Sequence, residues 1–212
     1  MINLLAVAFE PPPWLKASAA QQALAVFEQE QWSPEGAALR MIVAPCRWWG
    51  AVEAIEPAMR GMDAIVLLGA QRSEPHASVI ARAHNLADPH VPDAQTYLWP
   101  GQQISPRSVS VLHGGLEGEG LAEAMAAAGL SATPSVRDDY VYNRAFYTLR
   151  LRQPNVAMSL VRLPLSIESA RAEGRVGAFN RLQIVEGLRA GLSWMADSLR
   201  GRMGGDKLAV AV

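Results

Sequence analysis

Short apolar runs alternate with longer amphipathic stretches along this chain. The runs are four to nine residues long and nearly continuous, which is typical of strands covered on both faces. They lie at residues 2–9, 39–44, 64–68, 131–136 and 156–163. Apolar residues recur with helical spacing at about residues 16–30, 51–59, 120–128, 140–152 and 178–200. This alternation predicts an α/β domain with a mostly parallel sheet.

The remaining segments have weaker patterns. Residues 88–115 are rich in Pro, Gly, Ser and Asp and show no helical period, so we expect short hairpins or a long excursion over one sheet edge. No repeat or composition break indicates a second domain. We therefore assign residues 1–200 to one domain and predict a flexible tail at residues 201–212, where Gly201, Gly204 and Gly205 disfavour helix.

Composition narrows the possible functions. Half of the 212 residues are hydrophobic, 18% are charged, and the formal net charge is −1. Such a chain can bury a substantial core, and it lacks the basic field that nucleic acid or an anionic membrane would attract. We predict neither as a partner.

The start of the chain and its cysteine content favour a cytoplasmic location. Residues 1–9 are apolar, but they lack a basic leader region and run into Glu10 and three prolines, so we interpret them as a buried strand. The one cysteine, Cys46, excludes an intramolecular disulfide and suits a reducing compartment. No segment is apolar for long enough to span a membrane.

Four motifs follow one another along the chain. In order, the four are Ala8-Phe9-Glu10-Pro11, Asp63-Ala64-Ile65-Val66-Leu67-Leu68-Gly69, Ser135-Val136-Arg137-Asp138-Asp139-Tyr140-Val141-Tyr142-Asn143 and Val161-Arg162-Leu163-Pro164. The second motif leads without a gap to Ala83-His84-Asn85 and then to Val91-Pro92-Asp93. Together they resemble segments of the pyroglutamyl peptidase I (pyrrolidone-carboxylate peptidase) family, over about residues 1–195.

The resemblance implies a three-layer α/β/α fold of the phosphorylase/hydrolase-like kind. It also implies an oligomer and amide cleavage by a cysteine, a histidine and a glutamate. On this alignment the cysteine position holds Tyr142, the histidine position Arg162 and the glutamate position Ile80. A phenol is a poor nucleophile toward amides, an arginine cannot accept a proton at neutral pH, and an isoleucine orients nothing. We therefore interpret the chain as a degenerate relative, with no confident catalytic residue.

A polar set surrounds these vestigial positions. Tyr142 and Asn143 should begin a helix, where free N–H groups favour an anion, and Arg162 could add a fork of donors. Asp138 and Asp139 could cap the helix or pair with Arg162, and we favour the internal pair with Arg162 slightly over an anion site. The ligand-binding candidates are Glu10, Trp14, Asp138, Asp139, Tyr142, Asn143 and Arg162.

The turn that follows the first strand also departs from the family. In the family a Phe-Gly-Gly turn follows Phe-Glu-Pro, whereas the run here is Glu10-Pro11-Pro12-Pro13-Trp14, so rigid prolines replace two glycines that allow close backbone approach. Trp14, Trp48 and Trp49 either line the rebuilt pocket or belong to the core.

Metals and cofactors are not expected. His76, His84 and His90 lack the spacing of zinc ligands on one helical face, and no glycine-rich phosphate loop is present. We interpret Cys46, a lone cysteine at the end of the second apolar run, as a packing residue.

Three functions remain open. The chain is a non-catalytic subunit that binds a small anionic or peptide ligand or a partner protein, a hydrolase of altered chemistry, or an active peptidase whose site is misaligned. An altered hydrolase would use Asp138, Asp139, Glu10 or Glu74 as acid or base. The six tryptophans, with Trp48 and Trp49 beside Arg47, further predict a dimer or tetramer.

Overall fold

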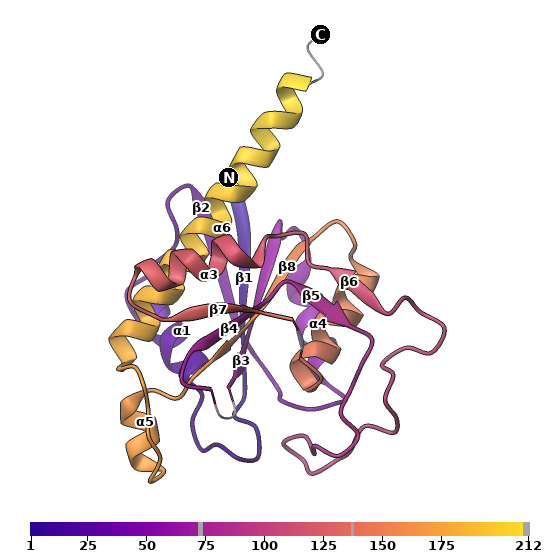
Figure 1. The fold of residues 1–212 in the computed structure, drawn as a ribbon. Helices are drawn as coiled ribbons and strands as arrows, with labels where there is room; N and C mark the ends of the chain where they lie inside the picture. The colour runs from indigo at the N-terminus through magenta and orange to yellow at the C-terminus, as the bar shows by residue number, and fades with distance from the viewer. Residues whose placement is uncertain (72–73, 137, 210–212) are drawn as a thin grey trace.

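The computed structural model describes residues 1–71, 74–136 and 138–209. It places a six-stranded sheet between two layers of helices (Figure 1). The strand order is β2-β1-β3-β8-β4-β7. The strands are β1 Ile2–Phe9, β2 Ala37–Ala44, β3 Ala64–Ala70, β4 Ala77–Ile80, β7 Ala132–Ser135 and β8 Ala157–Leu163. Among these described strands β4 and β8 pair antiparallel and the other neighbours pair parallel, so the predicted three-layer, mostly parallel fold is confirmed.

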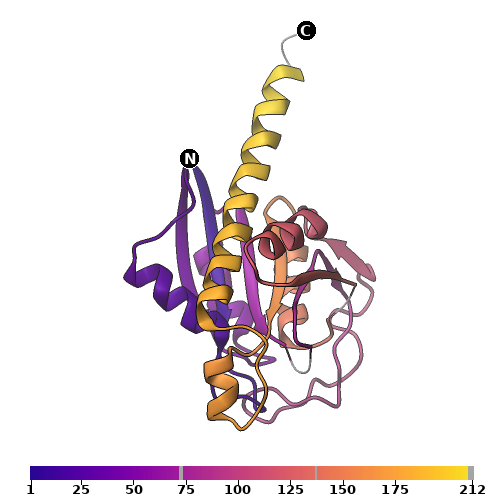
Figure 2. The same cartoon turned by 60° about the vertical axis from the view of Figure 1, so that its left-hand side comes forward.

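Helices cover both faces of the sheet. Their bounds are α1 Ala19–Gln29, α2 Ala51–Ile55 with the 3-10 turn η1 Glu56–Met59, α3 Gly118–Ala127, α4 Val141–Arg152, α5 Ile167–Ala172 and α6 Arg181–Ala209. The layer of α1, α3 and α6 packs on one face, and α2 and α4 pack on the other (Figure 2). In the described part of the chain no helix is long and apolar enough to cross a membrane.

The central strands are buried on both faces because their side chains alternate between two cores. In β1, Leu4, Ala6 and Ala8 face the α1 and α6 layer, whereas Leu5, Val7 and Phe9 face the α2 and α4 layer. The same alternation in β8 turns Leu160 toward α4 and Val161 toward α6. This alternation determines on which face of the sheet the side chain of each strand residue lies, including those that belong to the candidate site.

Four short elements, β4, α5, β5 (Arg82–His84) and β6 (Val111–His113), were not predicted individually from the sequence. Strand β4 has four residues, and α5 is too short to display an apolar stripe. Strand β5 forms a two-stranded hairpin with β6. Between them lies the expected excursion, the long loop at the right of Figure 1. It is fastened where Asn85 donates to the Ser105 carbonyl and accepts from the Ser105 N–H, both at 2.8 Å.

The last helix is longer than the sequence predicts. It runs to Ala209 rather than ending near Arg200, and its end extends past the amino end of β1 (Figures 1 and 2). Glycine lowers helix propensity by about 1 kcal/mol per residue but does not forbid helical dihedral angles. Helix α6 thus includes residues 201–209 of the segment predicted as a flexible tail, and residues 210–212 lie outside the described part.

Candidate functional site

Tyr142 and Arg162, which occupy the expected nucleophile and base positions, are brought together at one end of the sheet. Tyr142 lies in the first turn of α4, and Arg162 lies one residue before the end of β8. The tyrosine ring rests directly on the backbone of β3. A Cβ atom on Gly69 would lie 2.5 Å from the ring carbon Cδ2, so only glycine fits beneath this ring.

Both side chains line a small pocket of about 120 Å3 at the carboxyl ends of β3 and β8. This is the edge at which open α/β sheets bind their ligands. The lining residues are Trp14, Ala70, Asp88, Val91, Asp138, Asp139, Tyr140, Tyr142 and Arg162. Five of the seven predicted ligand-binding candidates are therefore brought together here.

Arg162 forms an ion pair with Asp138. The guanidinium Nη1 lies 3.1 Å from Asp138 Oδ2, and the side chains are 23% and 1% exposed. Asp138 Oδ1 accepts a hydrogen bond from the Tyr140 N–H at 2.8 Å, so this carboxyl also orders the turn that precedes α4. Burial raises the pKa of the Asp138 carboxyl, and the nearby Arg162 charge opposes this shift.

Tyr142 belongs to a buried group of polar aromatic side chains. It is 1% exposed, and burial raises the pKa of its phenol well above the ordinary value. The ring of Tyr140 packs edge-on against it at 5.1 Å, and the Tyr140 hydroxyl donates to the Pro92 carbonyl at 3.1 Å. The phenol of Tyr142 therefore stays protonated at neutral pH.

Cys46 lies beside the two phenols, a juxtaposition that the sequence did not reveal. Its Sγ is 3.7 Å from the Tyr140 hydroxyl and 3.9 Å from that of Tyr142. Burial raises the pKa of the Cys46 thiol to about 12, which leaves almost no thiolate at neutral pH. The thiol thus lies close to Tyr142 in an unreactive form.

Four other predicted residues do not line the pocket. Ile80 is fully buried in the apolar core on the α4 side of the sheet, where Tyr142 also packs. Asn143 is buried too, and its amide binds backbone: Oδ1 accepts from the His84 N–H, and Nδ2 donates to the carbonyls of His84 and Leu86. Its side chain thus holds β5 against α4. Glu10 is absent from the lining, and Glu74 lines a different surface pocket.

The three tryptophans that the sequence analysis singled out have three different roles. Trp14 lines the pocket, and its ring contacts that of Tyr140 at 5.0 Å. Trp48 is fully buried in the core, so it is not the interface residue that the sequence suggested. Trp49 is 50% exposed and stacks on Trp99 with ring centres 5.4 Å apart.

Asp88 and Val91 line the pocket although the sequence analysis did not select them. They lie at the start of the loop that has no periodic pattern, and although Val91 belongs to a motif, nothing in the sequence there distinguishes a pocket residue from a surface residue. Asp93, in the motif Val91-Pro92-Asp93, is buried and accepts hydrogen bonds from three backbone N–H groups, at 2.8, 2.8 and 3.0 Å. The motif was visible in the sequence, but this structural role of Asp93 was not.

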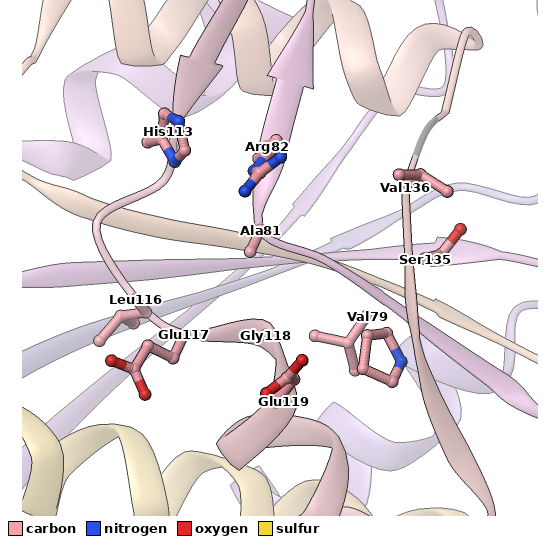
Figure 3. A pocket seen from close by; sticks show the side chains of 11 residues that line it. Val79, Ala81, Arg82, His113, Leu116, Glu117, Gly118, Glu119, Ser135 and Val136 are labelled. Atoms are coloured by element: carbon pink, nitrogen blue, oxygen red, sulfur yellow. The ribbon is translucent and has the colours of Figure 1, made fainter.

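A second, larger pocket of about 450 Å3 shares no lining residue with the first. Figure 3 shows Arg82 and His113 on one side of it and Glu117 and Glu119 on the other. These four side chains are exposed at the surface. Tyr142, Arg162 and Ile80 do not line this second pocket.

Comparison with solved structures identifies the fold. The pyroglutamyl peptidase I of Bacillus amyloliquefaciens superposes with a TM-score of 0.83 and 18% identity, over 93% of this chain and 98% of that one. The pyrrolidone carboxyl peptidase of Thermus thermophilus gives 0.79 and 25%, over 90% and 98%. That of Thermococcus litoralis gives 0.80 and 16%, over 95% and 96%. No protein-family profile matches the chain, and no curated protein is similar to it in sequence. The chain thus has the pyroglutamyl peptidase fold.

Proposed function

We propose that this chain is a non-catalytic relative of the pyroglutamyl peptidases that uses the pocket at Tyr142 and Arg162 for binding. The observation that carries the proposal is Tyr142 itself. A buried phenol with a raised pKa stands at the position to which the motif resemblance assigns a nucleophilic cysteine.

The neighbouring groups cannot replace the missing chemistry. Arg162 is a permanent cation held by Asp138, so it cannot accept a proton from a nucleophile. Ile80 provides no polar atom in the core. The thiol of Cys46 is near Tyr142, but its raised pKa and full burial make it inert.

The size of the pocket supports binding of a small group. A volume of about 120 Å3 is well below the ~300 Å3 at which pockets begin to enclose a drug-sized ligand. Trp14, which follows the three prolines, forms part of the wall. We expect one small head group to enter while the rest of a larger ligand stays outside.

Hydrolysis assays test the proposal. The protein should release no chromophore from a pyroglutamyl amide, and the rate should equal that of buffer. A rate proportional to protein concentration that is abolished by Arg162→Met would show that the pocket is catalytic. A rate that survives Tyr142→Phe but is lost on alkylation of Cys46 would identify the thiol as the nucleophile.

A hydrolase of altered chemistry is the second candidate, and Asp138 is the observation that favours it. A buried carboxyl with a raised pKa, in a pocket, is a plausible general acid. This candidate predicts turnover of some small amide or ester that falls at least a hundredfold in Asp138→Asn. A panel of such substrates without Asp138-dependent turnover would eliminate it.

We further propose that the protein self-associates as a dimer or tetramer and is cytoplasmic. The exposed aromatic and apolar residues Trp49, Tyr97 and Leu98 support self-association, since such residues are enriched at interfaces. The single free cysteine suits a reducing compartment. Light scattering at micromolar concentration should give a multiple of 22.9 kDa, and a monomer mass would contradict the first statement.

A further inference from the structure

The pocket at Tyr142 and Arg162 carries an excess of negative charge. The described lining residues Asp88, Asp138 and Arg162 together carry a formal charge of −1, and Asp139, which has interactions of its own, is left out of this count. Because Arg162 is already paired with Asp138, an anion entering the pocket would gain little from the arginine and would be repelled by Asp88.

The other walls are aromatic rings that meet at angles. Trp14 and Tyr140 are 5.0 Å apart and inclined at 53°, and Tyr140 and Tyr142 are 5.1 Å apart and nearly perpendicular at 82°. The face of an aromatic ring carries negative partial charge and attracts cations. Tyr140 and Tyr142 are 7% and 1% exposed, so the half-buried Trp14 is the ring that a ligand reaches most readily. Carboxylates and aromatic rings in one pocket thus favour the same kind of ligand.

Asp138 contributes charge to this pocket rather than a direct contact. Its Oδ2 is inaccessible to solvent and lies 3.1 Å from the Arg162 guanidinium, so a ligand in the pocket would feel this carboxylate through the intervening wall.

We propose that the pocket binds a small organic ammonium group rather than the anion that the sequence analysis left open. The volume of about 120 Å3 corresponds to about four water molecules at ~30 Å3 each, which suits the head group of a methylated amine. This proposal rests on the proposed binding function and specifies its ligand class.

Binding of defined probes to the intact protein tests this proposal. Choline and 3,3-dimethyl-1-butanol have the same shape but differ in charge, so saturation-transfer NMR of the two separates charge recognition from apolar packing. Choline should bind and the alcohol should bind at least about tenfold more weakly. Methylammonium and tetramethylammonium distinguish a primary from a quaternary ligand, and acetate and pyroglutamate test for an anion site.

Variants locate the binding. Asp88→Asn removes a lining charge with little change of shape and should weaken choline binding by about tenfold. Trp14→Leu should do the same by removing a ring face. Asp139→Asn gives a second charge variant if either of the others fails to fold by circular dichroism. Glu119→Gln removes a carboxylate from the separate pocket of Figure 3 and should leave binding unchanged.

The possible failures are distinguishable. Equal binding of choline and the alcohol, binding of the anions alone, or binding of no probe would overturn the ammonium proposal. Binding of pyroglutamate without turnover would do so while leaving the non-catalytic function intact. Turnover of a pyroglutamyl amide would instead overturn the proposed function, whichever probe binds.

Discussion

Replacing Arg162 by methionine should destabilise the fold, because it leaves Asp138 as a buried carboxylate without its cation. Two unit charges 3.1 Å apart attract by about 5 kcal/mol at an effective dielectric constant of about 20. The loss is limited because Asp138 can take up a proton instead. Protonating an aspartate whose pKa in the unfolded chain is about 3.9 costs about 4 kcal/mol at pH 7. We expect Arg162→Met to lower the free energy of unfolding by about 3 to 4 kcal/mol at pH 7.

The effect should depend on pH with a defined sign. Burial raises the pKa of folded Asp138, and without the arginine nothing described opposes the shift by charge. A folded state that binds the proton more tightly than the unfolded chain gains stability as pH falls. That gain is complete below the unfolded pKa and is lost as pH rises through the folded pKa. The deficit of Arg162→Met relative to wild type should therefore shrink to about 1 kcal/mol or less at pH 4.

Urea unfolding of wild type and variants at both pH values measures this deficit. Arg152 is a matched control, because it contacts Glu56 at 2.8 Å on the surface with side chains 48% and 39% exposed. Arg152→Met should cost no more than about 1 kcal/mol at either pH. In an Asp138→Asn background, Arg162→Met should also cost no more than about 1 kcal/mol. Equal, pH-independent losses for Arg162→Met and Arg152→Met would refute the reasoning.

Three further predictions follow from the surroundings of the pocket. Gly69→Ala should cost about 1 to 3 kcal/mol in urea unfolding, since its Cβ would overlap the Tyr142 ring, whereas Gly101→Ala, with open space around it, should be near neutral; equal losses would contradict the close approach. With a thiol pKa of about 12, Cys46 should be ~0.01% thiolate at pH 8 and should react with Ellman's reagent only after unfolding; rapid labelling of the native protein would contradict its burial. Asp93→Asn should cost about 2 kcal/mol by thermal or urea unfolding, since an amide supplies one acceptor oxygen in place of two and leaves a loop N–H without a partner; a loss below about 0.5 kcal/mol would contradict this.

The main elements of the fold were predictable because their signals are local. The runs at β1, β3 and β8 are continuous and apolar, and the elements observed there match the predicted ranges to within a few residues. Strand β4 was not predicted, because its four residues become a strand only by pairing with β7 and β8. Burial of a strand on both faces can be deduced from its own sequence, whereas the identity of its neighbours depends on the assembled sheet.

The site was predictable only where a motif fixed the position of a residue. Tyr142 and Arg162 were placed by flanking residues, and the structure brings them to one pocket. Cys46 and Asp88 could not be placed, since they reach the pocket region from a loop after β2 and from the excursion before β6, both far away in sequence. The charge of the pocket depends on such non-local contributions, which is why the sequence analysis could leave an anion site open although Asp88 also lines the pocket.

The central claim is that the pocket does not cleave pyroglutamyl amides. The most direct measurement incubates protein in excess over a fluorogenic pyroglutamyl amide for many hours, with an active pyroglutamyl peptidase as positive control. Under these conditions even a single slow turnover per molecule would be detected. We predict that the protein releases no more fluorophore than buffer alone or the Tyr142→Phe variant. Stoichiometric release by the wild type that is lost in Tyr142→Phe would contradict the account.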